Sequence, residues 1–247
     1  MIKIKNLFKS FEDHLVLKGI DLIIENSDTM VVMGASGCGK SVLLKLIIGL
    51  LKPDEGEIWI EDREISKLSE KQMDEVRKNI GMVFQSGALF DSLTVGENVA
   101  FSLVRRTNMS KSEIAKTVAE KLEMVGLSGI ENMMPAELSG GMRKRVSLAR
   151  AISMNPQIVL YDEPTTGLDP LMSDEINTLI SKLHNELNVT SVVVTHDKKS
   201  AFTVGTKMAM LKNGEIVASG TPDEIRSSKD QWVYDFVNTG FFYKDTQ

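Results

Sequence analysis

A glycine-rich loop carries the clearest chemical pattern in this sequence of 247 residues. It spans Gly34–Ser41 and matches G-x-x-x-x-G-K-[ST], with an apolar run before it and helical spacing after it. Glycines let the backbone wrap around a phosphate chain at the positive end of a helix. Lys40 would then place its charge on the β- and γ-phosphates, and Ser41 would offer a hydroxyl to Mg²⁺. The alternative is a glycine-rich turn with a chance lysine, and the strand–loop–helix context favours the phosphate site.

Two acidic residues follow a short apolar run, Ile158–Tyr161. A hard cation that bridges phosphates prefers carboxylate oxygen, so Asp162 is the candidate to hold Mg²⁺. Glu163 comes next and should point to the other side of the strand end, where it would orient and deprotonate the attacking water. The alternative is a pair of acids that merely ends a strand.

A second glycine pair opens another helical stretch. Leu138-Ser139-Gly140-Gly141-Met142 precedes the helical pattern of residues 143–152. A helix start has N–H groups without intrahelical partners, so this segment is a second candidate anion site.

The elements that must position these residues alternate along the chain. Continuous apolar runs at Thr29–Met33, Ile158–Tyr161 and Ser191–Thr195 are typical of strands buried on both faces of a parallel sheet. A helical pattern behind Pro170 lies between the last two runs and predicts an α/β fold. Residues 1–25 and 56–66 predict a flanking antiparallel sheet. Residues 86–150 contain no convincing strand and predict an inserted helical subdomain, with a capping box at Ser110 and Glu113.

Composition excludes several classes of protein. The formal net charge is −5, from 29 Lys and Arg against 34 Asp and Glu, which argues against an electrostatic nucleic-acid binder. A single cysteine excludes an internal disulfide framework. The densest apolar stretch, residues 42–51, is too short to span a membrane. We therefore expect a cytoplasmic protein, which a membrane partner could hold on the inner face of the cytoplasmic membrane.

The motif set resembles that of ABC-transporter ATPase subunits over nearly the whole chain. The Gly34–Ser41 loop, the Leu138–Met142 signature, Asp162-Glu163-Pro164, Gly167-Leu168-Asp169 and His196 occur in that family's order and spacing. The resemblance implies one ATPase domain over residues 1–247: a P-loop α/β core at 1–85 and 151–247, the helical subdomain at 86–150 and a C-terminal extension at 226–247. The residues implied to contact ATP in the same chain are Phe11, Val16, Gly34, Ala35, Ser36, Gly37, Cys38, Gly39, Lys40, Ser41 and Val42.

The same resemblance implies a dimer of two such subunits stacked head to tail, with ATP between the phosphate loop of one and Ser139, Gly140 and Gly141 of the other. Asp169 would couple the two sites across the seam. The resemblance further implies that Gln85 contacts the attacking water and joins Ser41 and Asp162 as a contact of Mg²⁺. His196 would contact the γ-phosphate and hold Glu163 and the water in place.

Several of these residues have a structural alternative. Phe11, which would stack on adenine, could be a core residue, Gln85 a surface turn residue and His196 a structural histidine. Cys38 is either a small residue that fills the loop or an accessible reactive thiol. The family's signature normally ends in Gln, where this chain has Met142. Any polar contact of that glutamine is lost, whereas the backbone N–H groups remain.

Met142 and the run Ser86–Phe90 after Gln85 resemble the ATPases of bacterial Mla-type systems, which move phospholipid between the envelope membranes. That resemblance implies permease subunits, a periplasmic lipid-binding subunit of the mammalian-cell-entry type and a small regulatory subunit as partners. The end of the sequence is rich in aromatic residues: Trp232, Tyr234, Phe236, Phe241, Phe242 and Tyr243. This segment would either pack on a neighbouring subunit or close the chain's own core.

Other classes remain as alternatives. The same motifs fit the ATPase of an amino-acid or ion importer, or of a lipoprotein-release or cell-division complex. A soluble DNA-repair or translation ATPase would be expected to carry two cassettes, a long coiled coil or zinc cysteines, which this sequence lacks. A structural protein with an inactive site is disfavoured by the presence of Lys40, Asp162, Glu163 and His196.

Overall fold

A computed structural model describes residues 1–238, which fall into two compact units. The first unit contains residues 1–67 and the chain from residue 193 onward, and the second contains Leu68–Val192. The boundaries predicted for the helical subdomain at 86–150 and for the C-terminal extension remain predictions. Phe241, Phe242 and Tyr243 lie outside the described residues.

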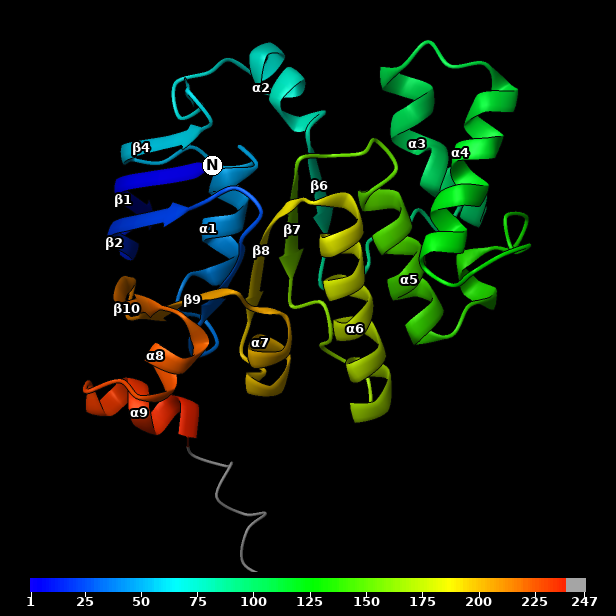
Figure 1. Ribbon diagram of the computed structural model, residues 1–247. Coiled ribbons are helices and arrows are strands. Elements are labelled where there is room, and N and C mark those ends of the chain that lie inside the picture. Colours follow the sequence, from blue (N-terminus) through cyan, green and yellow to red (C-terminus); the bar gives the residue numbers. More distant parts are fainter. Residues whose placement is uncertain (239–247) are drawn as a thin grey trace, which may run out of the picture. The chain divides into compact units, whose positions relative to one another are not determined.

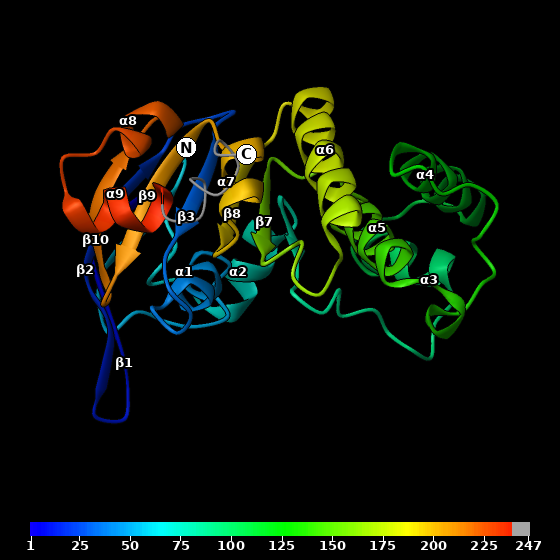
Figure 2. The ribbon, with the colours of Figure 1, turned by 90° about the horizontal axis from the view of Figure 1, so that it is seen from below.

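The first unit contains an antiparallel sheet with the strand order β2-β1-β4-β5. It also contains a parallel pair, β3 with β9, in which Met30 lies opposite Lys207, and β10 adds to β9 in antiparallel fashion. Figure 2 shows α8 beside β9 and β10, with α9 against α8. The elements of this unit are β1 (Ile2–Phe11), β2 (His14–Ile24), β3 (Thr29–Met33), α1 (Lys40–Ile47), β4 (Glu55–Ile60), β5 (Arg63–Glu64), α7 (Lys198–Val204), β9 (Lys207–Lys212), β10 (Glu215–Gly220), α8 (Pro222–Arg226) and α9 (Gln231–Asn238).

The second unit contains a parallel strand pair, β6 with β7, in which Ile80 lies opposite Ile158. Helices α3, α4 and α5 pack against one another, and α6 contacts α5 (Figure 1). Its elements are α2 (Glu70–Arg77), β6 (Ile80–Val83), α3 (Val95–Arg106), α4 (Lys111–Met124), the 3₁₀ turn η1 (Pro135–Glu137), α5 (Gly140–Ala151), β7 (Ile158–Asp162) and α6 (Pro170–Leu187). Strand β8 (Thr190–Thr195) contains the boundary between the two units.

The three continuous apolar runs do form strands. Every residue of β3, β7 and β8 is buried, as expected for strands that are covered on both faces. The capping box at Ser110 and Glu113 is present at the start of α4, and Pro170 occupies the first turn of α6. The local sequence therefore sets these helix starts as predicted.

Candidate functional site

The loop Gly34–Ser41 joins the buried strand β3 to helix α1 in the first unit. Helix α1 begins after Gly39, which has a left-handed backbone (φ 107°), and no side chain caps the helix start. Lys40 is buried, and its ammonium donates to the carbonyl oxygens of Gly34 (2.9 Å) and Ala35 (3.0 Å). The lysine therefore holds the loop folded back over the helix start, where a phosphate would meet both the first N–H groups of the helix and a positive charge.

The glycine at the first position of this loop is required by packing. A Cβ on Gly34 would lie 2.2 Å from the carbonyl oxygen of Leu211. A Cβ on Gly37 would meet no described atom within 4 Å, but its φ of 80° is one that L side chains rarely adopt. Gly34 therefore allows β9 to approach, and Gly37 allows the loop to turn.

A cavity of about 420 Å³ lies beside this loop, within the same unit. It includes Cys38, which is half-buried, and Val16, both predicted to contact ATP. Phe11 is not among its described walls: its side chain is 42% exposed, with the Lys9 ammonium 5.6 Å from the ring centroid. The walls of the cavity are His14, Leu15, Val16, Lys18, Ala35, Ser36, Gly37, Cys38, Leu211, Lys212, Asn213, Gly214 and Trp232.

His196 also belongs to the first unit, directly after β8. The histidine is exposed, and the next residue, Asp197, caps α7 by accepting from the backbone N–H of Ser200 (2.9 Å). The hydroxyl of Thr195 accepts from the backbone N–H of Asp197 (3.0 Å). These bonds fix the backbone on both sides of His196.

In the second unit, β7 ends in the two predicted acids. Asp162 and Glu163 are 7% and 8% exposed. Glu163 has a left-handed backbone (φ 47°), which is unusual for a residue with a side chain and turns the chain out of the strand. Its carboxylate accepts from the hydroxyl of Thr166 at 3.1 Å. A buried carboxylate held by a hydroxyl could act as a general base, and this role of Glu163 stays a prediction.

Gln85 follows β6 and is exposed, in a loop that helix α5 holds by its backbone. The buried Lys144 ammonium donates to the carbonyl oxygen of Gln85. Arg150 donates to the carbonyl oxygens of Ala88 (2.7 Å) and Gly87 (2.9 Å). Hydrogen bonds from α5 therefore hold the backbone of the loop that carries Gln85.

Lys144 is a residue of this region that the motifs do not predict. Burial lowers the pKa of the Lys144 ammonium, and the charges of Glu163 and Asp162 act in the opposite direction. The same helix face carries Ser147, whose hydroxyl donates to the carbonyl oxygen of Gly87 at 3.0 Å. The sequence does carry a signal for Lys144. Residues 144, 147 and 150 are polar and spaced three apart among buried apolar neighbours, which places them on one face of α5.

The second glycine pair lies at the start of α5. Ser139 caps this helix by accepting from the backbone N–H of Met142 at 3.2 Å, and both Ser139 and Gly140 are exposed. A Cβ on Gly141 would lie 1.9 Å from the terminal methyl of Met172. Asp169 caps α6 by accepting from the N–H of Met172 at 3.0 Å. The turn at 167–169 and the glycine pair are therefore packed together within this unit.

A model of the family described as "ABC transporter" matches residues 17–166. The chain belongs to the ABC transporter family. The predicted fold of this ABC ATPase, an α/β P-loop core with antiparallel strands and a helical region, is confirmed. It is the ATP-binding, ATP-hydrolysing subunit of an ABC transporter.

Relatives of this ABC ATPase differ in the transport function that their names state. MlaF of Haemophilus influenzae, the ATP-binding protein of an intermembrane phospholipid transport system, is 40% identical across 96% of this chain and 90% of its own length. A probable ribonucleotide transport ATP-binding protein of Mycobacterium leprae, mkl, is 41% identical across 96% and 68%. The methionine import protein MetN of Clostridioides difficile is 41% identical across 91% and 70%.

A solved structure gives the same fold. The ATP-binding cassette MJ0796, in a dimeric post-hydrolysis state with ADP and phosphate, has a TM-score of 0.83 and 38% identity, and the match covers 90% of this ABC ATPase and 98% of that chain.

Two features are absent from residues 1–238 of this ABC ATPase. No helix in this range is long and apolar enough to cross a membrane. No group of three or more His, Cys, Asp or Glu residues in this range is arranged to hold a metal ion.

Proposed function

We propose that this chain drives phospholipid transport between the inner and outer membranes of a bacterium, as a peripheral ATPase on the cytoplasmic face of the inner membrane. The likeness to MlaF over nearly the full length of both chains supports this cargo. So do Met142 and the run Ser86–Phe90, which resemble the Mla-type ATPases. The importer alternative rests on MetN, whose identity to this chain is similar.

The proposed catalytic unit is a homodimer in which each ATP lies between the phosphate loop of one copy and Ser139, Gly140 and Gly141 of the other. Exposure of Ser139 and Gly140 supports this arrangement, because these first residues of α5 face solvent in one chain and could meet a nucleotide held by another. The dimeric state of the MJ0796 cassette also supports it. Asp169, which caps α6 and lies close to the glycine pair through Met172, is suited to couple the two sites.

The proposed mechanism gives each functional side chain a role toward ATP, Mg²⁺ and water. Oxygen donors are what Mg²⁺ prefers, and the Ser41 hydroxyl, the Asp162 carboxylate and the Gln85 amide oxygen supply them. Bound Mg²⁺ would neutralise charge on the β- and γ-phosphates. Glu163 would take a proton from the attacking water, and His196 would hold the γ-phosphate and Glu163.

A groove in the second unit supports coupling to a permease. Its volume is about 380 Å³, and its apolar wall includes the rings of Phe90 and Phe101, which are tilted by 32° with centroids 4.5 Å apart. Its rim carries four basic residues, three of which pair with carboxylates of α2: Arg77, Lys78, Arg106 and Arg150. The groove adjoins the loop that carries Gln85, so a helix of the permease bound there would sense the state of that loop.

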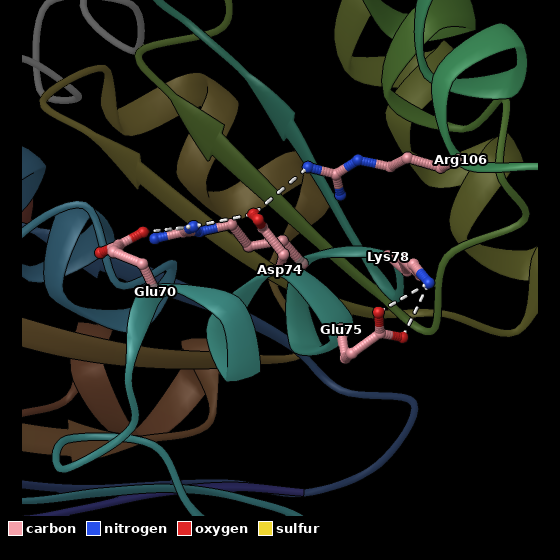
Figure 3. A network of polar contacts seen from close by, with 6 residues as sticks. Glu70, Asp74, Glu75, Lys78 and Arg106 are labelled. Carbon is pink, nitrogen blue, oxygen red and sulfur yellow. Dashed lines mark hydrogen bonds and ion pairs between the residues drawn. The ribbon is translucent and has the colours of Figure 1, made fainter.

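Ion pairs hold the rim of this groove in shape (Figure 3). Arg77 contacts Glu70 at 3.0 Å and Asp74 at 3.2 Å along α2. Arg106, from the end of α3, reaches the same Asp74 at 3.8 Å. The pair Lys78–Glu75 (2.7 Å) completes the rim. Exposed pairs of this kind contribute little stability, so their role here is to orient the rim.

The test uses the complete transporter in proteoliposomes, with ATP hydrolysis and transfer of fluorescent phospholipid to acceptor vesicles measured together. Glu163→Gln should lower hydrolysis by about 100-fold or more and stop lipid transfer, because the water loses its base. Glu123→Gln, the same chemical change at an exposed position of α4, should leave both unchanged. ATP-driven methionine uptake without lipid transfer would overturn the proposed cargo, and normal hydrolysis by Glu163→Gln would overturn the mechanism.

A further inference from the structure

One wall of the cavity beside the phosphate loop is formed by a residue that belongs to none of the family motifs. Most of its lining comes from the start of β2, the phosphate loop and the turn between β9 and β10. The remaining wall is Trp232, from α9, the last helix that the structure describes. Almost two hundred residues separate Trp232 from the phosphate loop, so only the fold brings them to one cavity.

The position of Trp232 is well defined by its neighbours. Val233 and Val237 are buried, which anchors α9 to the first unit and leaves Trp232 on an adjoining, partly exposed face. The Lys212 ammonium lies 4.7 Å from the centroid of the indole, and the Phe236 ring centroid lies 5.2 Å away. A cation over one face and a ring beside it hold the indole at the cavity wall.

The chemistry of the cavity suits a nucleoside as well as a phosphate. Leu15, Val16, Leu211 and Trp232 give an apolar surface, whereas His14, Lys212 and Asn213 can bond to hydroxyl groups and ring nitrogens. An aromatic wall stacks on any base, because every base has a π face. Phe11, the aromatic residue that the motif predicts, lies outside this lining.

We infer that Trp232 contacts the nucleoside of the nucleotide bound at the phosphate loop of the same chain. The inference rests on the nucleotide site proposed above and adds a residue that the motifs of the family do not include. Its consequence is that a bound nucleotide contacts α9 directly.

Fluorescence tests this contact directly, because the chain has two tryptophans, Trp59 and Trp232. In the variant Trp59→Phe, ADP should change the emission of Trp232 saturably and protect it from quenching by acrylamide, with the Kd that calorimetry gives. Tripolyphosphate, which has no nucleoside, should bind by calorimetry and leave the emission unchanged. In the variant Trp232→Phe, the emission of Trp59 should not respond to ADP.

Affinity supplies the second readout. Trp232→Leu should weaken ADP binding by roughly five- to tenfold and leave tripolyphosphate binding unchanged, a split that a merely structural role would not produce. Trp232→Phe should bind ADP within about twofold of the unmodified chain because a ring remains. Tyr234→Leu, at an exposed position of the same helix and outside the cavity lining, is the matched control and should bind normally.

The outcomes separate this inference from the proposed function. If ADP binds by calorimetry while Trp232 emission stays constant, or if tripolyphosphate changes the emission as much as ADP does, the nucleoside contact is wrong and the ATPase assignment stands. If neither ADP nor ATP binds by calorimetry, the nucleotide site itself is wrong.

Discussion

Two glycine-containing turns of this ATPase lead into helices, Gly34–Ser41 into α1 and Leu138–Met142 into α5. They differ in how the first N–H groups of the helix are hydrogen-bonded. At α1 the cap is Gly39, and no side chain bonds to the helix start. At α5 the cap is Ser139, whose hydroxyl already accepts from the N–H of Met142. The first residue of α1 is a buried lysine, Lys40, whereas the first residue of α5 is Gly140.

We expect this difference to separate nucleotide binding from ATP hydrolysis. A helix start with uncapped N–H groups and an adjacent ammonium can hold a phosphate within one chain. A helix start that is partly capped attracts an anion less strongly, and we expect its exposed residues Ser139 and Gly140 to meet a nucleotide that another copy already holds. Changes at the first turn should therefore abolish nucleotide binding, whereas changes at the second should abolish hydrolysis and spare binding.

The largest effect is expected for Lys40→Met. Without the ammonium, the loop loses its bonds to the carbonyls of Gly34 and Ala35 and its charge toward phosphate. ATP hydrolysis should fall by about 100-fold or more, and calorimetry should detect no ADP binding at concentrations that saturate the unmodified chain. Lys45→Met, at an exposed position of the same helix, is the control. Normal ADP binding by Lys40→Met would contradict the comparison.

The next effect concerns packing at the two turns. Gly34→Ala would place a methyl group 2.2 Å from the Leu211 carbonyl oxygen, so the free energy of unfolding should fall by roughly 2–3 kcal/mol. Among the described residues, a methyl group at Gly140→Ala meets nothing closer than Leu168, at 3.7 Å, so this variant should unfold at an unchanged or slightly higher temperature. Thermal unfolding of the two variants gives the measurement, and equal destabilisation would show that the turns are equally constrained.

Local patterns were sufficient to predict much of this molecule. The continuous apolar runs gave β3, β7 and β8, because strands buried on both faces need apolar residues throughout. Helix starts with a capping residue were also predictable, since a cap bonds to its own first turn. The phosphate loop and the acidic pair follow from short motifs whose geometry is set within a few residues.

What the sequence could not predict depends on contacts between distant segments. Strand β6 does not follow from its local pattern, because it has four residues and Gly81 interrupts it. Packing requires that glycine, since a Cβ placed there would lie 2.2 Å from the Ala151 carbonyl oxygen. The bond from Lys144 to Gln85 spans 59 residues. Trp232 and the phosphate loop, which line the same cavity, are separated by still more residues of sequence. Periodicity reports which face of an element is buried and carries no information about which distant residue meets it.

A smaller effect on stability, with a clear effect on turnover, is expected for Ser139→Ala. Loss of the cap should cost about 1 kcal/mol of folding free energy. Hydrolysis should fall roughly tenfold through the lost contact to the facing nucleotide, with the Kd of one chain for ADP unchanged.

Ser110→Ala removes the equivalent cap from α4 and is the matched control for this change. It should lose similar stability, measured by urea unfolding, and keep full hydrolysis. If both variants hydrolyse ATP equally well, the hydroxyl of Ser139 serves only as a cap.

The smallest effect is expected for Met142→Gln, which restores the residue that the family's signature normally has. The N–H of residue 142 bonds to Ser139 in either case, so the helix start and its remaining N–H groups are unchanged. The side chain is half-buried, and stability should change by less than about 0.5 kcal/mol. Hydrolysis measured by phosphate release should stay within about twofold, because backbone groups supply the attraction for phosphate. A tenfold rise would mean that the side chain at this position, and not the helix start, determines turnover, and the contrast between the two turns would then lie in one residue.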